Sequence, residues 1–487
     1  MAQRRYVPGG VLRSRGAGGP AGSGPVAGAV RSGLMAPPSL IRRREIIAAL
    51  RNGTVPRRGL ELFAVGLGRF DAAIEEELGR AALGEGVFKA VRGEYGTGKT
   101  FFSRWVQHRA QQAGFATSDV QISETETPLY RMETLYRRAL ENLRTREWES
   151  GAFRSLIDKW FFTLEEEVAG RPGFDPEAEG GMSEAVGELL EARLSEIKAT
   201  HPQFASVLRA CHRARVEGDD ATSEGLLGWL MGQPNVGAEP KRAAGIKGEI
   251  DHFAASGFLR GLLVVLRETG RKGLLLVLDE VETVQRMRAD SREKSLNALR
   301  QLIDELDGGR YPGLYVMITG TPAFYDGPQG VRRLAPLEQR LHVDFTGDPR
   351  WESAKATQIR LHPFDVDRLV EVGRLVRDLY PAHAPERVSA RVTDEVVRDL
   401  AVGVTGYFGG KVGVAPRIYL RKLIGELLDK VDEHPEYDPA KHFKLVVDAR
   451  EMTAEERAAA GVESSVGDLP LEAGDGSSGG AGSHELE

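Results

Sequence analysis

Three short runs of apolar residues, each bounded by glycine or polar residues, predict the buried strands of a sheet. They lie at residues 86–93 (GVFKAVRG), 273–279 (GLLLVLD) and 313–320 (GLYVMITG), and a more mixed run at 115–123 (FATSDVQIS) predicts another strand. Continuous apolar runs of this length are typical of parallel strands that are covered on both faces. The pattern therefore favours an α/β fold built on a parallel sheet.

The stretches between these runs have helical spacing of their apolar residues. Glycines at the ends of two of them, Gly53 and Gly114, stand where a helix would stop. A short alternating run at 341–345 (LHVDF) predicts the last strand of the sheet. The expected helices cover 39–53, 98–114 and 291–309, nearly all of a long block at 129–270, and most of 360–432.

Both ends of the chain lack a hydrophobic period and are expected to be disordered. Residues 1–38 form a basic arm rich in Gly, Ala, Pro and Ser, and residues 451–487 form an acidic, Gly/Ser-rich tail. Such segments are commonly solvated tails, although a basic arm can also contact DNA phosphates. The arginines that precede the first acid, Glu45, are Arg4, Arg5, Arg13, Arg15, Arg31, Arg42, Arg43 and Arg44.

Composition narrows the class of protein. The chain has 487 residues, of which 41% are hydrophobic, so it can bury a sizeable core in two or three domains. Its net charge of -6 does not by itself indicate a nucleic-acid partner. Cys211 is the single cysteine, which excludes an internal disulfide and fits a reducing cytoplasm. No apolar run reaches the ~20 residues of a spanning helix, and no secretory signal is expected.

A glycine-rich stretch between the first strand and the next helix predicts a phosphate-binding loop. Residues 93–100 (GEYGTGKT) fit the Walker A pattern G-x-x-x-x-G-K-[ST] in its strand–loop–helix context. Glycines let backbone N–H groups wrap around a triphosphate, and the start of a helix favours an anion. ATP and Mg²⁺ are the expected ligands. The loop residues expected to bind them are Gly93, Glu94, Tyr95, Gly96, Thr97, Gly98, Lys99, which would neutralise phosphate charge, Thr100, which would ligate Mg²⁺, and Phe101.

Two acids at the end of a later strand predict the other half of this site. Asp279 and Glu280 follow an apolar run, where an ionised carboxylate is costly unless it is paired or meets a metal. Asp279 is expected to hold Mg²⁺ from its outer coordination sphere, and Glu280 to act as the general base. Thr319 and Thr321, at the tip of the next strand, are both candidates to bond the γ-phosphate or the attacking water. The chain has no N-K-x-D guanine-reading motif, so adenine is the expected base.

The chain resembles AAA+ ATPases of the origin-recognition type. It more closely resembles the ATP-binding proteins of bacterial BREX phage-defence clusters. Segments spanning residues 44–425 carry the resemblance, and WLMGQP and LDEVET narrow it to the BREX family. This likeness implies an AAA+-like core at 39–357 that contains a helical insert at 129–270, followed by a helical lid at 358–450.

The resemblance also assigns roles outside the loop. The stretch around Val55, Pro56 and Gly66 would lie against the adenine, and Arg417 would reach the γ-phosphate from the lid. Arg340, just before the expected last strand, would act as the arginine finger on a neighbouring subunit. The alternatives for that role are Arg332 and Arg333.

The function expected from these motifs is ATP hydrolysis that drives a switch or motor. Expected partners are further copies of the chain, DNA and other defence proteins, with no membrane. Two alternatives stay open: a P-loop phosphotransferase, and an ATP-binding scaffold with little turnover.

Overall fold

A computed structural model describes residues 38–172, 181–407, 415–446 and 457. Contacts within the chain divide it into two units, Met1–Ser39 and Leu40–Glu487, and the described strands and helices belong to the second unit. The predicted basic arm and acidic tail lie outside the described residues, apart from residues 38 and 457.

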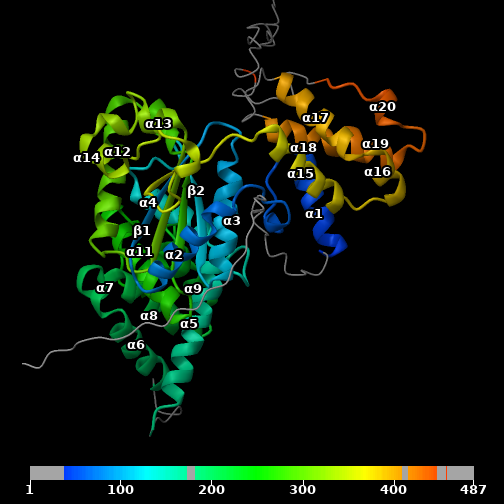
Figure 1. The fold of residues 1–487 in the computed structure, drawn as a ribbon. Coiled ribbons are helices and arrows are strands. Elements are labelled where there is room, and N and C mark those ends of the chain that lie inside the picture. Colours follow the sequence, from blue (N-terminus) through cyan, green and yellow to red (C-terminus); the bar gives the residue numbers. More distant parts are fainter. Residues whose placement is uncertain (1–37, 173–180, 408–414, 447–456, 458–487) are drawn as a thin grey trace, which may run out of the picture. The chain divides into compact units, whose positions relative to one another are not determined.

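Five parallel strands form one sheet in the order β2-β3-β4-β1-β5 (Figure 1). Arg92 of β1 is in register with Gly320 of β4, and Gln121 of β2 with Asp279 of β3, so the carboxyl ends of these strands share one edge. The four strands predicted from the apolar runs are therefore confirmed. The bounds are β1 Val87–Arg92, β2 Ala116–Gln121, β3 Leu274–Asp279, β4 Leu314–Gly320 and β5 Gln358–Arg360.

The predicted last strand at 341–345 is wrong. Leu341 ends a helix, α14 (Ala335–Leu341), and residues 342–345 are irregular. The ring of Phe345 faces the guanidinium groups of Arg92 and Arg360, the last residues of β1 and β5, at 4.9 and 5.0 Å. The last strand is β5, which begins one residue beyond the predicted end of the core at 357.

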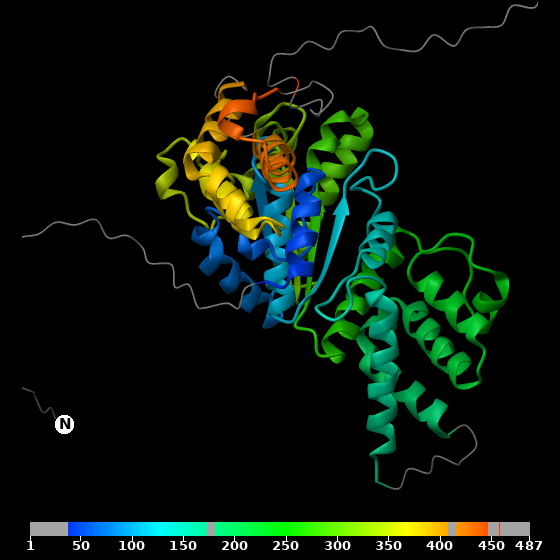
Figure 2. The same ribbon diagram turned by 90° about the vertical axis from the view of Figure 1, so that its right-hand side faces the viewer.

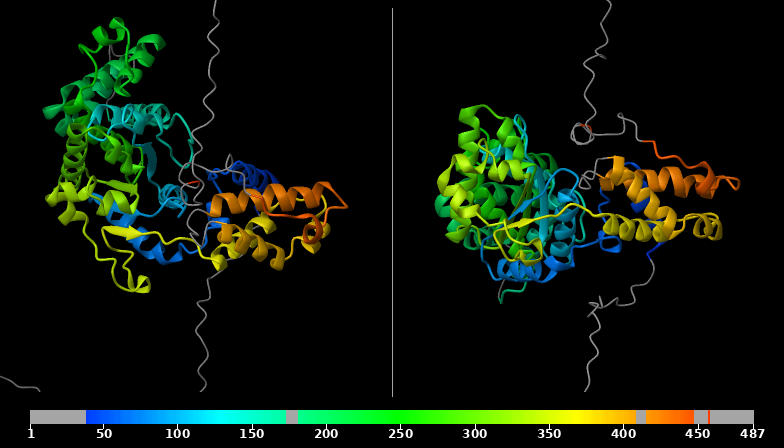
Figure 3. Two further views of the ribbon diagram at one scale, coloured as in Figure 1. Left: turned by 90° about the horizontal axis from the view of Figure 1, so that it is seen from above. Right: turned by 45° about the horizontal axis from the view of Figure 1, so that its top comes forward.

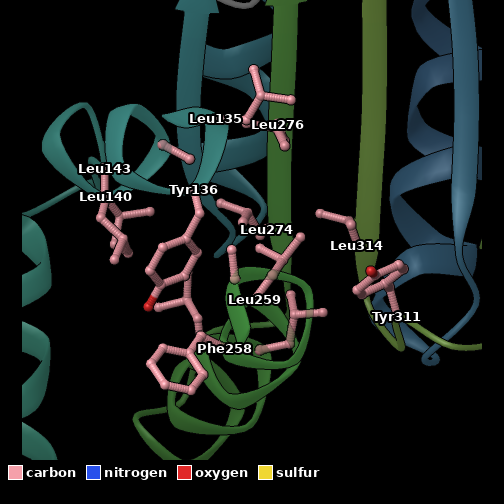
Figure 4. Close-up of a cluster of buried hydrophobic side chains, with 14 of the residues drawn as sticks. Leu135, Tyr136, Leu140, Leu143, Phe258, Leu259, Leu274, Leu276, Tyr311 and Leu314 are labelled. Carbon is pink, nitrogen blue, oxygen red and sulfur yellow. The ribbon is translucent and has the colours of Figure 1, made fainter. Parts of the chain in front are cut away.

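Alternate residues of each strand point to opposite faces, and both faces are covered by helices. Leu274, Leu276 and Leu278 of β3 belong to one hydrophobic core, and Leu275 and Val277 to the other. This period of two explains why the strands read as continuous apolar runs. Figure 4 shows part of the first core, where α4 (Met132–Glu141) and α11 (His252–Glu268) pack on the sheet. Its labelled side chains are Leu135, Tyr136, Leu140, Leu143, Phe258, Leu259, Leu274, Leu276, Tyr311 and Leu314.

The described chain between β2 and β3 is helical, as the pattern at 129–270 predicted. Figure 2 shows α5 in teal and the later helices of this block in green. No helix in the described ranges is long and apolar enough to cross a membrane. Besides α4 and α11, the helices of the block are α5 Ala152–Ala169, α6 Gly181–Arg193, α7 Ser195–Thr200, α8 Pro202–Val216, α9 Asp220–Leu230 and α10 Ala238–Ala243.

The second core joins α1 to helices in the C-terminal part of the described chain, through residues such as Ile46, Ile47 and Leu423. Arg51, at the end of α1 (Leu40–Arg51), pairs with Asp429 at 2.7 Å, and Figure 3 shows α1 in blue beside the C-terminal helices in yellow and orange. This contact places one wall of the site described below. The remaining helices are α2 Asp71–Ala82, α3 Lys99–Gln112, α12 Ala289–Asp307, α13 Pro322–Asp326, α15 Val366–Leu379, α16 Pro385–Arg391, α17 Asp394–Tyr407, α18 Ala415–Lys422, α19 Asp429–Glu433 and α20 Pro439–His442, with a π-helical segment Leu423–Leu428 that links α18 to α19.

Candidate functional site

The loop between β1 and α3 wraps around its own lysine. Gly96 and Gly98 have φ angles of 78° and 90°, in the left-handed region that favours glycine. A Cβ atom at Gly93 would lie 2.4 Å from the hydroxyl oxygen of Thr97, so a side chain at that position would force Thr97 to move. The ammonium of Lys99 donates to the carbonyl oxygen of Gly93 at 3.0 Å. The composition of the loop therefore follows from its tight curvature.

Side chains from three elements meet at the carboxyl edge of the sheet. The hydroxyl of Thr100 in α3 lies 3.5 Å from Oδ2 of Asp279, at the end of β3. The hydroxyl of Thr319 in β4 donates to Oδ1 of the same carboxylate. The structure thus brings together three of the residues that the sequence predicted, and it groups oxygen atoms of the kind that hard cations prefer.

Glu280 has a backbone conformation that is uncommon for a residue with a side chain. Its φ of 59° and ψ of 41° lie in the left-handed region, and such residues cluster at functional sites. The turn directs its carboxylate toward β2, where the amide of Gln121 donates to Oε2 at 2.8 Å. Sequence reasoning missed Gln121, although a polar residue at the carboxyl end of a strand beside β3 was a usable signal.

Glu282 is a second residue that sequence reasoning missed. Its side chain is buried in the first turn of a short 3-10 helix, Val281–Arg286, with the residue only 6% exposed. Oε1 lies 3.8 Å from the ammonium of Lys99. Burial raises the pKa of the Glu282 carboxyl, the charge of Lys99 opposes that shift, and Asp279 and Glu280 add to it. The available signal was a third acid two residues after Glu280.

These groups line one cavity of about 340 Å³. Lys99, Thr100, Asp279, Glu280 and Glu282 line it together with residues 95–98 of the loop and Phe101. Gly93 and Glu94 are not among the described residues that line it. The remaining wall is largely apolar and comes from segments far apart in the sequence, so the cavity offers both a charged end and an apolar end. Its apolar lining includes Val55, Phe63, Val65, Phe70, Phe101, Leu361, Phe364, Val372 and Leu420.

The residues assigned through the family resemblance divide into two groups. Val55, Gly66 and Arg417 line the cavity, and Arg417 comes from α18. Pro56 is not among the described residues that line it. Neither are Thr319 and Thr321, the two threonines predicted from their place at the tip of a strand. Thr321 is buried before the first residue of α13.

The three candidate finger arginines also lie outside the described lining of this cavity. Nε of Arg340 pairs with Oδ1 of Asp304 at 2.5 Å, and its Nη1 donates to the carbonyl oxygen of Pro336 at 2.7 Å. Arg332 lies 3.7 Å from Glu338, and Arg333 is exposed.

The fold and the site define an α/β protein with a five-stranded parallel sheet and a glycine-rich loop that opens a helix. The family model of the BREX system ATP-binding protein BrxC/D matches residues 39–447, and the chain belongs to this family. The predicted resemblance to the ATP-binding proteins of this phage-defence system is thereby confirmed. No curated protein and no solved structure matches the chain.

Proposed function

We propose that the chain binds ATP with Mg²⁺ in this cavity, hydrolyses the ATP, and acts as a switch or motor with nucleic-acid-processing partners in phage defence. The observation that carries the proposal is the convergence of Lys99, Thr100, Asp279 and Glu280 in one cavity at the carboxyl edge of the sheet. Membership of an ATP-binding family supports the choice of nucleotide.

The triphosphate occupies the charged end of the cavity. There the unpaired N–H groups of the first turn of α3 and the ammonium of Lys99 favour an anion. The base occupies the apolar end, between the stretch around Val55 and the side chains from the C-terminal helices. In this proposal those helices form an AAA+-like lid, from which Arg417 reaches the γ-phosphate.

The residues at the edge of the sheet fit a magnesium ion. The hydroxyl of Thr100 and the carboxylate of Asp279 lie 3.5 Å apart and offer oxygen ligands. The ion would bind the hydroxyl directly, and Asp279 would hold it through its outer coordination sphere. When bound, Mg²⁺ supplies positive charge against the phosphate oxygens. Thr319, which donates to Asp279, keeps that carboxylate oriented.

Glu280 is the general base in this proposal. Its carboxylate takes a proton from the attacking water as the oxygen of that water forms a bond to the γ-phosphorus and the bond to ADP breaks. Gln121 holds one of the two carboxylate oxygens, which leaves the other for the water. The left-handed turn at Glu280 carries the side chain beyond the end of β3.

Phosphate release from ATP, measured with and without DNA and with Mg²⁺ present, tests the proposal. Free phosphate that appears without a phosphorylated acceptor supports hydrolysis. Transfer of labelled γ-phosphate to an added acceptor would instead support the phosphotransferase. Tight ATP binding without either product would instead support the ATP-binding scaffold with little turnover.

A further inference from the structure

The carboxylate of Glu282 is buried beside Lys99 of the loop. Among the described residues, neither of its oxygens has a hydrogen-bond partner, and the residue is 6% exposed. It also lines the cavity. A buried carboxylate is costly unless a positive charge compensates it, so the 3.8 Å contact with Lys99 is its main compensation.

Lys99 is in turn fully engaged inside the loop. Its ammonium has three N–H donors, and it lies 3.0 Å from the carbonyl oxygen of Gly93, 3.4 Å from that of Glu94 and 3.8 Å from Glu282. The ring of Tyr95 covers the ammonium, whose nitrogen is 4.9 Å from the ring centre. A phosphate that recruits this ammonium must therefore compete with the loop carbonyls and with a carboxylate.

We propose that Glu282 is a positioning residue that holds Lys99 inside the loop, and that ATP binds against the cost of separating this pair. The inference rests on the proposed ATP binding at this site. Once Lys99 turns to the phosphates, the carboxylate of Glu282 is left buried and faces added negative charge. Glu282 therefore lowers the affinity for nucleotide, which keeps the site exchangeable and not permanently filled.

The charges around Glu282 fix the direction of a pH effect. Lys99 of α3 faces it, Asp279 and Glu280 at the end of β3 add negative charge, and Tyr325 of α13 lies near it with Arg92 of β1 behind. Burial already raises the pKa of Glu282 in the empty site, and loss of Lys99 to a phosphate raises it further. Binding then takes up a proton, so affinity rises as the pH falls.

Calorimetric titration with ATP and Mg²⁺ tests this role of Glu282. Glu282→Gln keeps the shape of the side chain and removes its charge, so we expect ATP to bind at least about tenfold more tightly at pH 8, as for the loss of one opposing charged contact. The gain should shrink at pH 6, where the wild-type carboxylate takes up its proton more readily. Protonation of ATP itself affects both proteins equally and cancels in the comparison.

Glu77→Gln is the matched control. Glu77 is also a buried carboxylate that pairs with a lysine, Lys89 of β1, but it is not among the described residues that line the cavity. We expect this variant to bind ATP as the wild type does. Glu282→Met, which removes the charge without adding an amide that needs partners, repeats the test if Glu282→Gln folds poorly.

The outcomes separate this inference from the proposed function. Equal or weaker ATP binding by folded Glu282→Gln or Glu282→Met, beside a wild type that binds, overturns the role of Glu282 alone. A folded wild-type chain that binds no ATP overturns the proposed function and this inference with it. Tighter binding that is lost toward acid pH supports both.

Discussion

The side-chain amide of Gln121, at the end of β2, donates a 2.8 Å hydrogen bond to the carboxylate of Glu280, at the end of β3. The two strands are neighbours in the sheet, and Gln121 is in register with Asp279, the residue before Glu280. The candidate base is therefore held from the adjacent strand, on the side away from Thr319. This hydrogen bond restrains the rotation of the Glu280 carboxylate.

We expect Gln121→Ala to raise basal phosphate release by up to about tenfold, the factor that one hydrogen bond to a charged group represents. The affinity for ATP should stay unchanged, because Gln121 is not among the described residues that line the cavity. Steady-state phosphate release and a parallel ATP titration measure the two effects. A fall in turnover would mean that the amide positions Glu280 for catalysis.

Lys99→Ala should abolish tight ATP binding. The variant removes the side-chain cation that the loop folds around, and with it the charge that compensates Glu282. Titration calorimetry reads the loss directly. Wild-type affinity in this variant would rule out the loop as the phosphate site.

Glu280→Gln should bind ATP and turn it over at least ~10²-fold more slowly, the usual scale for the loss of a general base. The amide keeps the size of the side chain, so binding is the internal control. Single-turnover phosphate release measures the chemical step apart from product release. An unchanged rate would move the base to another residue.

Asp432→Asn should destabilise the C-terminal helices by about 1 to 3 kcal/mol at pH 7, since it weakens bonds to a buried charge. Burial alone would raise the pKa of Asp432, but hydrogen bonds from the backbone of His383 and Ala384 and from the His383 ring outweigh it and lower the pKa. A lowered folded pKa stabilises the protein above the usual pKa of an aspartate, and this stability is lost as the pH falls through the folded value.

Urea unfolding at several pH values measures this effect. The difference between Asp432→Asn and the wild type should shrink as the pH falls below about 4. Asp399→Asn, an exposed change in α17, is the control and should match the wild type throughout. A difference that stays constant down to pH 3 would show that the charge of Asp432 is not the source.

Arg340→Ala should bind ATP normally and hydrolyse it poorly if Arg340 is the finger, because such a charge acts in the transition state. Mixing it with Lys99→Ala should restore some activity, from intact loops served by arginines of the other subunit. In the described structure Arg340 forms an ion pair with Asp304. Asp304→Asn weakens this pair and leaves Arg340 available to a neighbouring subunit, so this variant should not lower ATP hydrolysis. If mixed oligomers form without rescue, Arg333 and Arg332 are the next to test.

The sequence predicted β1, β3 and β4 because each is apolar on both faces, and it predicted the loop because its glycines obey a geometric need. It missed β5, in which Ile359 is the one apolar residue of three. β5 is an edge strand that pairs with β1, and the side-chain amide of Gln358 donates there to the carbonyl oxygen of Leu341 at 2.8 Å. That stabilisation comes from residues distant in the chain, which no local pattern reveals.

In the candidate site, too, some residues could be predicted from local motifs and others could not. Thr100, Asp279 and Glu280 could be named from motifs, and the structure brings them to one edge of the sheet. Gln121 and Glu282 matter through what they face, and their partners Glu280 and Lys99 lie in other elements. The spacing of residues along the sequence does not predict such contacts between separate elements.

The helical block between β2 and β3 has a consequence for the order of folding. The two strands are partners in the sheet, yet the chain leaves β2 at Gln121 and returns at Leu274. Pairing strands this far apart costs loop-closure entropy, and such distant contacts form slowly. A chain emerging from the ribosome presents the loop long before the strand that carries Asp279 and Glu280. Under the proposed function, the site is therefore completed late in synthesis. A chain that stalls within α4–α11 carries the glycine-rich loop without Asp279 and Glu280.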